Sequence, residues 1–170
     1  MSMLKKIFKN GTHKFTLSEE IKPLLSAKEI FILEQIGIPK RILYTDIICS
    51  EVYVENNAIV FGISNSFPTK YGIELTSRNV FSYSINDYTE KLFINSNLES
   101  FVMSYFCLDF FVGKSIQSET LGAYYDKSPE GGNFEQYANL LEMLITDIDD
   151  RATKEGVWAF FIGEMKLGVI

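Results

Sequence analysis

The side chains in this sequence that could do chemistry are mainly carboxylates. Asp147, Asp149 and Asp150 cluster at the end of a predicted helix. A helix C-terminus already carries partial negative charge, so three carboxylates there are unfavourable unless something neutralises them. The cluster leaves three interpretations open: a solvated surface, a contact with a basic partner, or a divalent-cation site. It does not have the spacing of an EF-hand loop.

Other catalytic residue types are scarce. The single histidine, His13, would have to serve any Ser-His-Asp or Cys-His arrangement, and the sequence contains no G-x-S-x-G, P-loop or G-x-G-x-x-G motif. Asp149 and Asp150 could form a hydrolase pair, but adjacent helical residues point about 100° apart and converge poorly on one substrate. We therefore predict no catalytic residue, no cofactor and no resident metal.

The two cysteines, Cys49 and Cys107, each lie in an apolar stretch, with neither metal-ligand nor C-x-x-C spacing. They predict buried free thiols and a reducing compartment rather than a disulfide. The longest apolar run, 157–162, has six residues against the roughly 20 that span a membrane. The basic N-terminus is not followed by the apolar region of a secretory signal. We therefore expect a cytoplasmic protein with no membrane contact.

Charge and composition narrow the class of protein. The chain has 170 residues, with 22 Asp and Glu against 16 Lys and Arg, a net charge of −6. Residues 1–85 carry 10 basic and 8 acidic side chains (+2), whereas residues 86–170 carry 6 and 14 (−8). Direct nucleic-acid binding is disfavoured because phosphate contacts need surplus Lys and Arg. The 46% hydrophobic content predicts a folded core, and the length predicts a single domain, 1–170, with residues 1–14 as a loosely ordered basic arm.

Two capping boxes and a set of short alternating segments predict the elements. Ser26 and Glu29 form one box, before a helix that Gly37 and Pro39 end; Ser96 and Glu99 form another, before a helix to about residue 112. Strands are expected at 51–54, 58–64, 71–75, 79–84 and 91–95, and helices at 134–150 and 157–166. Short turns favour antiparallel neighbours. The fold class is therefore α+β, with a mainly antiparallel central sheet of about five to six strands and helices packed around it.

Four stretches, in this order, resemble the SUKH superfamily of bacterial immunity proteins and, within it, the fourth group. They are 31–39, an apolar helix closed by Gly-apolar-Pro; the paired strands at 58–63, 73–75 and 80–81; the Asn-Ser stretch within 93–101; and 148–152 followed by Trp158. Together they extend over roughly residues 15 to 170. The chain departs from the family pattern at Asp150, where Pro is expected, and at Asn97, where Ser is usual.

The resemblance implies a non-enzymatic immunity protein that binds and neutralises a polymorphic toxin in the cytoplasm by stoichiometric contact. Such toxins are often nucleases or deaminases, and a basic toxin would be steered to an acidic surface. Adjacent tyrosines in a loop suit either contact or core roles, whereas the single Trp158 is expected in the core. The candidate partner-binding residues are Asp109, Glu119, Tyr124, Tyr125, Asp126, Glu130, Asp147, Asp149 and Asp150. The alternative is a regulatory protein- or peptide-binding module with no antitoxin role, and the oligomeric state stays open.

Overall fold

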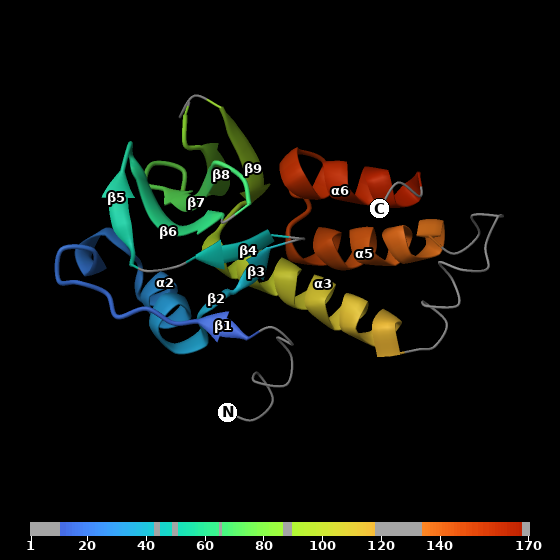
Figure 1. The fold of residues 1–170 in the computed structure, drawn as a ribbon, viewed down its shortest axis with the longest axis horizontal. Helices are drawn as coiled ribbons and strands as arrows, with labels where there is room; N and C mark the ends of the chain where they lie inside the picture. The colour runs from blue at the N-terminus through green and yellow to red at the C-terminus, as the bar shows by residue number, and fades with distance from the viewer. Residues whose placement is uncertain are drawn as a thin grey trace. The chain divides into compact units, whose positions relative to one another are not determined.

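The computed structural model describes residues 11–42, 45–48, 51–64, 66–86, 90–117 and 134–167, without the side chains of 41, 42, 45, 109–117, 134 and 136. The chain divides into two compact units. We call Asn10–Val102 the sheet unit, and the unit whose described residues begin at Met103 the helical unit. The α+β class is confirmed (Figure 1). The expectation of one domain over 1–170 stays a prediction.

The sheet is antiparallel at every pairing described. Six strands follow the order β3-β4-β6-β7-β8-β9, and β5 pairs with β6 off this path. The strands are β3 (Arg41–Ile42), β4 (Thr45–Ile48), β5 (Tyr53–Glu55), β6 (Ala58–Ser64), β7 (Thr69–Glu74), β8 (Val80–Ser84) and β9 (Lys91–Asn95). Alternation in the sequence indicated half-buried strands. By contrast, five successive residues of β6 and four of β8 are buried, so both faces of these strands are covered.

The N-terminal helical segment of the sheet unit begins where its sequence predicts. After a short 3-10 turn, η1 (Lys22–Leu24), Ser26 caps α2 (Ala27–Phe31), and the capping box with Glu29 is complete. The helix then widens into a π turn, η2 (Ile32–Ile36), and Gly37 leaves it at φ +89°. A Cβ at Gly37 would lie 2.6 Å from the His13 carbonyl oxygen, so glycine is required there.

The segment before this helix satisfies the carbonyl groups at its end. The Thr12 hydroxyl donates to the Ile36 carbonyl (2.9 Å), and the Phe15 amide donates to the Leu33 carbonyl (3.0 Å). Thr12–His13 forms β1, which pairs with β2 (Ile38–Pro39). Residues 12 and 13 of the expected basic arm are therefore part of the fold.

Glu29 also joins α2 to the β7–β8 turn. Its carboxylate accepts hydrogen bonds from the Ser26 amide (2.7 Å) and hydroxyl (2.8 Å). It also forms an ion pair with the Arg78 guanidinium, whose Nε lies 3.2 Å from Oε1. Arg78 holds a left-handed backbone at φ +63° while also donating to the Leu24 carbonyl. A residue other than glycine is strained in that backbone conformation, so the ion pair stabilises a turn that is otherwise unfavourable.

The next helix, α3 (Leu98–Gln117), starts in the sheet unit and continues into the helical unit. Its cap is Asn97, whose side chain accepts from the Ser100 amide (2.9 Å), while its carbonyl accepts from Phe101. The prediction of Ser96 as the cap is therefore wrong by one residue, and the helix runs past residue 112. Phe101 packs against Phe61 of β6, with ring centroids 5.5 Å apart.

The helical unit adds two further helices, which lie side by side in Figure 1: α5 (Phe134–Ile148) and α6 (Gly156–Lys166). Trp158 is fully buried, which confirms its core role. The centroid of its ring lies 4.8 Å from that of Tyr105 and 6.2 Å from that of Phe161. Leu141, Ile145 and other apolar side chains complete this core. Within the described residues, no helix combines the length and hydropathy of a membrane span.

Candidate protein-interaction site

The three clustered aspartates do not share one environment. The helix α5 ends at Ile148, and the chain then turns, with the Ala152 amide donating to the Asp149 carbonyl (2.9 Å). Asp147 and Asp150 are exposed, whereas Asp149 is only 7% exposed. Asp149 is therefore not available to a partner in the way that its neighbours are, because the turn directs it inward.

Local ion pairs hold this turn. Lys154 Nζ lies 2.5 Å from Asp150 Oδ2. Arg151 donates to both carboxylate oxygens of Glu155, at 3.0 and 3.1 Å. The hydrogen bonds from Arg151 lower the pKa of Glu155, and the same carboxylate raises the pKa of Arg151. A hydroxyl contact between Thr146 and Thr153 (3.1 Å) links the end of α5 to the turn.

Acidic side chains are in excess in the helical unit. Residues 103–170 contain 11 acidic and 5 basic side chains, and with the three lysines of residues 1–9, which belong to the same unit, its net charge is −3. Among the side chains described there, seven are acidic and three are basic, and each of the three basic ones is in a salt bridge: Arg151, Lys154 and Lys166. Glu135, Asp147 and Glu164 are left with no salt bridge in the part that the structure describes. The unpaired charge of this unit, as far as it is described, is therefore negative.

The remaining predicted contact residues are not brought together by the described structure. Asp109 belongs to α3, but its side chain is outside the described part. Five others lie outside the described residues altogether: Glu119, Tyr124, Tyr125, Asp126 and Glu130. Their grouping on one surface stays a prediction.

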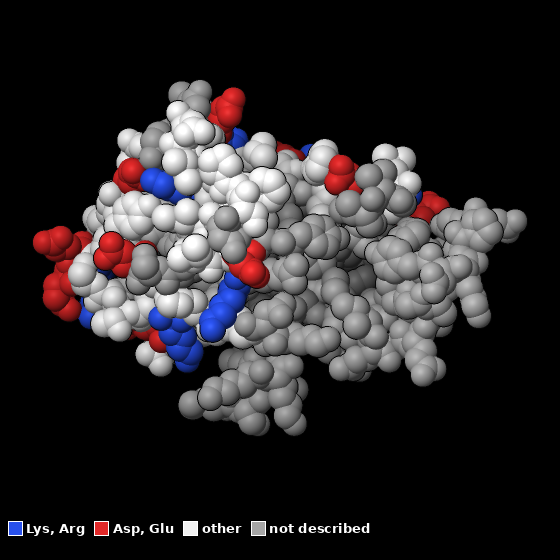
Figure 2. All heavy atoms as spheres, in the orientation of Figure 1, with Lys and Arg blue, Asp and Glu red and all other residues white. Residues whose placement is uncertain are grey.

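Sequence reasoning missed an apolar component of this surface. Leu140 and Met143 are exposed on α5, and Phe160 and Leu167 are exposed at 67% and 80% on or directly after α6. The sequence contained a signal for this exposure. If residues 158, 161 and 162 of a helix face the core, residue 160 faces outward. Figure 2 shows acidic side chains in the region of α6.

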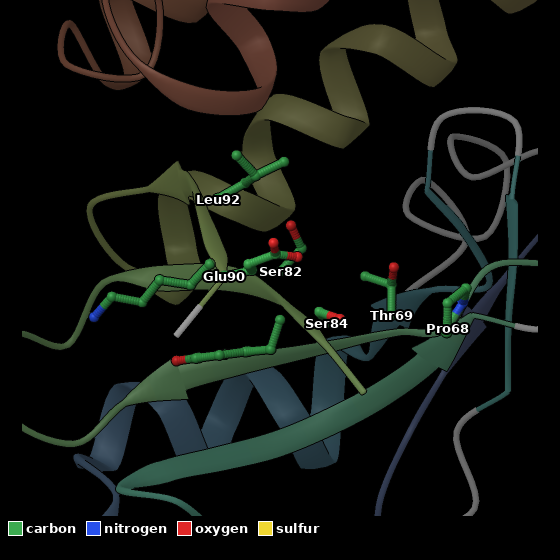
Figure 3. Close-up of a pocket in the computed structure, with 8 residues that line it drawn as sticks. Pro68, Thr69, Ser82, Ser84, Glu90 and Leu92 are labelled. Carbon is green, nitrogen blue, oxygen red and sulfur yellow. The ribbon is translucent and has the colours of Figure 1, made fainter. Parts of the chain in front are cut away.

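A second candidate lies on the sheet unit, where a hollow of about 520 Å³ opens beside β9. Figure 3 shows Thr69, Ser82, Ser84 and Leu92 around it, on three adjacent strands. The register places Thr69 opposite Ser84 and Ser82 opposite Leu92, so all four share one face of the sheet. Hydroxyl groups can donate and accept, which suits a neutral polar group such as a peptide backbone.

Among the described residues, no three His, Cys, Asp or Glu side chains come together as a group that could hold a metal ion. Cys107 has a free, half-buried thiol, and burial raises its pKa. Cys49 lies outside the described residues. Comparisons of the chain with protein-family models, with curated proteins and with solved structures found no match.

Proposed function

We propose that this protein is an immunity protein that binds a basic toxin in the cytoplasm and neutralises it by stoichiometric contact through the acidic surface of the helical unit. The observation that carries the proposal is the set of unpaired carboxylates there, Glu135, Asp147 and Glu164, in a unit whose described cations are all paired. Unpaired carboxylates attract a basic partner over distance and raise its association rate. The resemblance to SUKH immunity proteins supplies the class of partner.

In this mechanism the protein needs no catalytic group. It covers the positive groove with which a nuclease or deaminase would hold phosphates, and competes with nucleic acid for that groove. Asp150 is engaged by Lys154, so it contributes less attraction than the three unpaired carboxylates.

The test uses the protein encoded by the adjacent gene, prepared as a catalytically inactive variant. We expect a one-to-one complex whose Kd rises at least about tenfold between about 50 and 500 mM NaCl. Charge reversal of Glu135, Asp147 and Glu164 to lysine should weaken binding by about 10- to 100-fold. The matched control reverses three exposed acids of the sheet unit, Glu20, Asp46 and Glu51, and should leave the Kd within about threefold.

Co-expression with the active neighbour gives the functional readout. Wild-type protein should restore growth, and the helical-unit triple variant should not. No complex and no restored growth would reject the antitoxin role, whereas a complex insensitive to salt and to both triple variants would reject the acidic surface.

A second candidate, a peptide-binding module, is favoured by the hydroxyl-lined hollow beside β9, the last strand of the described sheet. An extended peptide could add to this strand and place a side chain in the hollow. Leu92→Asp would then abolish peptide binding without affecting contact with the adjacent gene product. A screen of immobilised peptides with wild type and this variant separates the two functions.

A further inference from the structure

The helix α6 has two apolar faces, and its own unit covers one of them. Trp158, Phe161 and Ile162 are buried, whereas Phe160 and Leu167 remain 67% and 80% exposed. Phe160, Gly163, Glu164 and Leu167 stand at i, i+3, i+4 and i+7, so they form one line along the helix. We call these four residues the outer line of α6.

Packing against the described residues does not explain Gly163, in the middle of this line. A Cβ at this position would meet no atom of the described residues within 4 Å, and the residue is not in the left-handed region. Glycine inside a helix is less stable than alanine because it loses more backbone freedom on folding. Its position between two exposed apolar side chains leaves the helix backbone open to close approach by another molecule.

The charges around the outer line are negative. Glu164 has no salt bridge among the described residues, and the neighbouring cation, Lys166, is bonded to Glu142 of α5 at 2.7 Å. Asp147 and Glu135 on α5 are likewise unpaired. A partner that covers the outer line therefore meets the unpaired Glu164 carboxylate within it, and the other unpaired charges described in the unit are also negative.

These charges distinguish between occupants. A two-fold dimer through α6 would set the same patch against itself and bring like charges together. A basic partner would instead pair with Glu164 while its apolar side chains cover Phe160 and Leu167. We infer that the outer line of α6 is the apolar centre of the docking surface for a basic protein, whose contacting segment carries apolar side chains flanked by Lys or Arg. The inference deepens the proposed function. That the basic protein is a toxin rests on that proposed function.

A model ligand tests the recognition chemistry without the toxin. The probe is a 14-residue amphipathic helix of Leu and Lys, titrated into the ¹⁵N-labelled full chain and compared with a Leu and Glu peptide. We expect the Lys peptide alone to shift the amides of 160–167. The double variant Phe160→Ser with Leu167→Ser should weaken its binding at least about tenfold, while Phe67→Ser with Ile48→Ser, which removes two exposed apolar side chains of the sheet unit, should not.

Gly163→Ala separates docking from stability. The variant should raise the urea midpoint, because alanine favours the helix, and yet weaken peptide binding about three- to tenfold by blocking close approach. If Gly163→Ala and the Phe160/Leu167 variant both leave binding unchanged, or if the shifts map outside α6, the inference is overturned. A wild-type dimer that the Phe160/Leu167 variant abolishes would also overturn it, because the occupant would be a second copy.

The same variants separate this inference from the proposed function. Lys-peptide binding on α6, with no complex or growth rescue from the adjacent gene product, would reject the antitoxin role and keep the docking surface. A toxin complex that tolerates the Phe160/Leu167 variant would reject the docking surface and keep the antitoxin role.

Discussion

The sheet unit and the helical unit use their charges differently. In the sheet unit, five of the six described ion pairs join residues at least 12 positions apart, among them Arg78 with Glu29, Lys70 with Glu55, and Lys91 with Glu74, and one, Lys22 with Glu19, is local. In the helical unit, two of the three described pairs are local, at i and i+4, and one joins α5 to α6.

Unpaired charges differ as well. In the described part of the sheet unit, Lys14 and Lys40 lack a salt bridge, and so do some acidic side chains. In the described part of the helical unit, only acidic side chains lack one. Both units have an apolar core; in the sheet unit ion pairs also join distant parts of the chain, whereas in the helical unit most described ion pairs are local and the unpaired charge is acidic.

The largest expected effect tests the apolar core of the helical unit. Trp158→Ala should lower the free energy of unfolding by about 3–5 kcal/mol, because it removes a fully buried ring packed on Tyr105 and Phe161. Phe160→Ala, which removes an aromatic ring from the exposed side of the same helix, should lower the free energy of unfolding by less than about 1 kcal/mol. Urea denaturation followed by circular dichroism measures both, and equal losses would contradict the assigned core.

The next effect tests whether long-range ion pairs support the sheet unit. Arg78→Ala should cost about 2–3 kcal/mol, since it leaves the buried Glu29 carboxylate without its cation, and the partial exposure of Arg78 reduces the loss. Arg151→Ala, the local counterpart, should leave the urea midpoint almost unchanged. Arg78→Gly should be about 1 kcal/mol less damaging than Arg78→Ala, because glycine accepts the left-handed backbone.

A smaller effect concerns the buried phenol of Tyr83 in the sheet unit. Its hydroxyl has no hydrogen-bond partner in the described structure, so Tyr83→Phe should stabilise the protein by about 1 kcal/mol at neutral pH. Burial, with a contribution from Glu74, raises the pKa of Tyr83 to about 12. The folded state therefore holds this proton more tightly than the unfolded state, whose pKa is near 10.

The sign of the pH dependence follows from that difference. The contribution is full below about pH 10 and is lost as the pH rises through about 12, so Tyr83→Phe should flatten the alkaline fall in stability. Urea midpoints between about pH 7 and 11 measure this, with Tyr53→Phe as the control for loss of a hydroxyl. An alkaline profile identical to wild type would show that another group is responsible.

The smallest effect tests the unpaired acids of the helical unit. Asp147→Asn should stabilise the protein by about 0.3–0.5 kcal/mol at low salt, because Asp147 stands near the negative end of α5. Glu135→Gln, in the first turn of the same helix, should destabilise it by a similar amount. Both differences should disappear at about 1 M NaCl, and their persistence would point to packing rather than charge.

Local signals predicted the elements better than they predicted the site. The Ser26 box, the β9 bounds and the core role of Trp158 follow from spacing alone. The cap of α3 could not be chosen, because Ser96 and Asn97 are both good caps and the end of β9 decides between them. Asp149 was misplaced because helical geometry stops applying once α5 ends at Ile148.

The course of α3 has a practical consequence for dividing the molecule. The boundary between the units falls between Val102 and Met103, within the continuous hydrogen bonding of Leu98–Gln117, and Phe101, Val102, Ser104 and Tyr105 beside it are buried. A helix interior is a poor protease substrate, so limited proteolysis should not release the units at this point. Genetic fusions or truncations placed there would leave each fragment with a frayed half-helix and exposed aromatic rings, and both should aggregate.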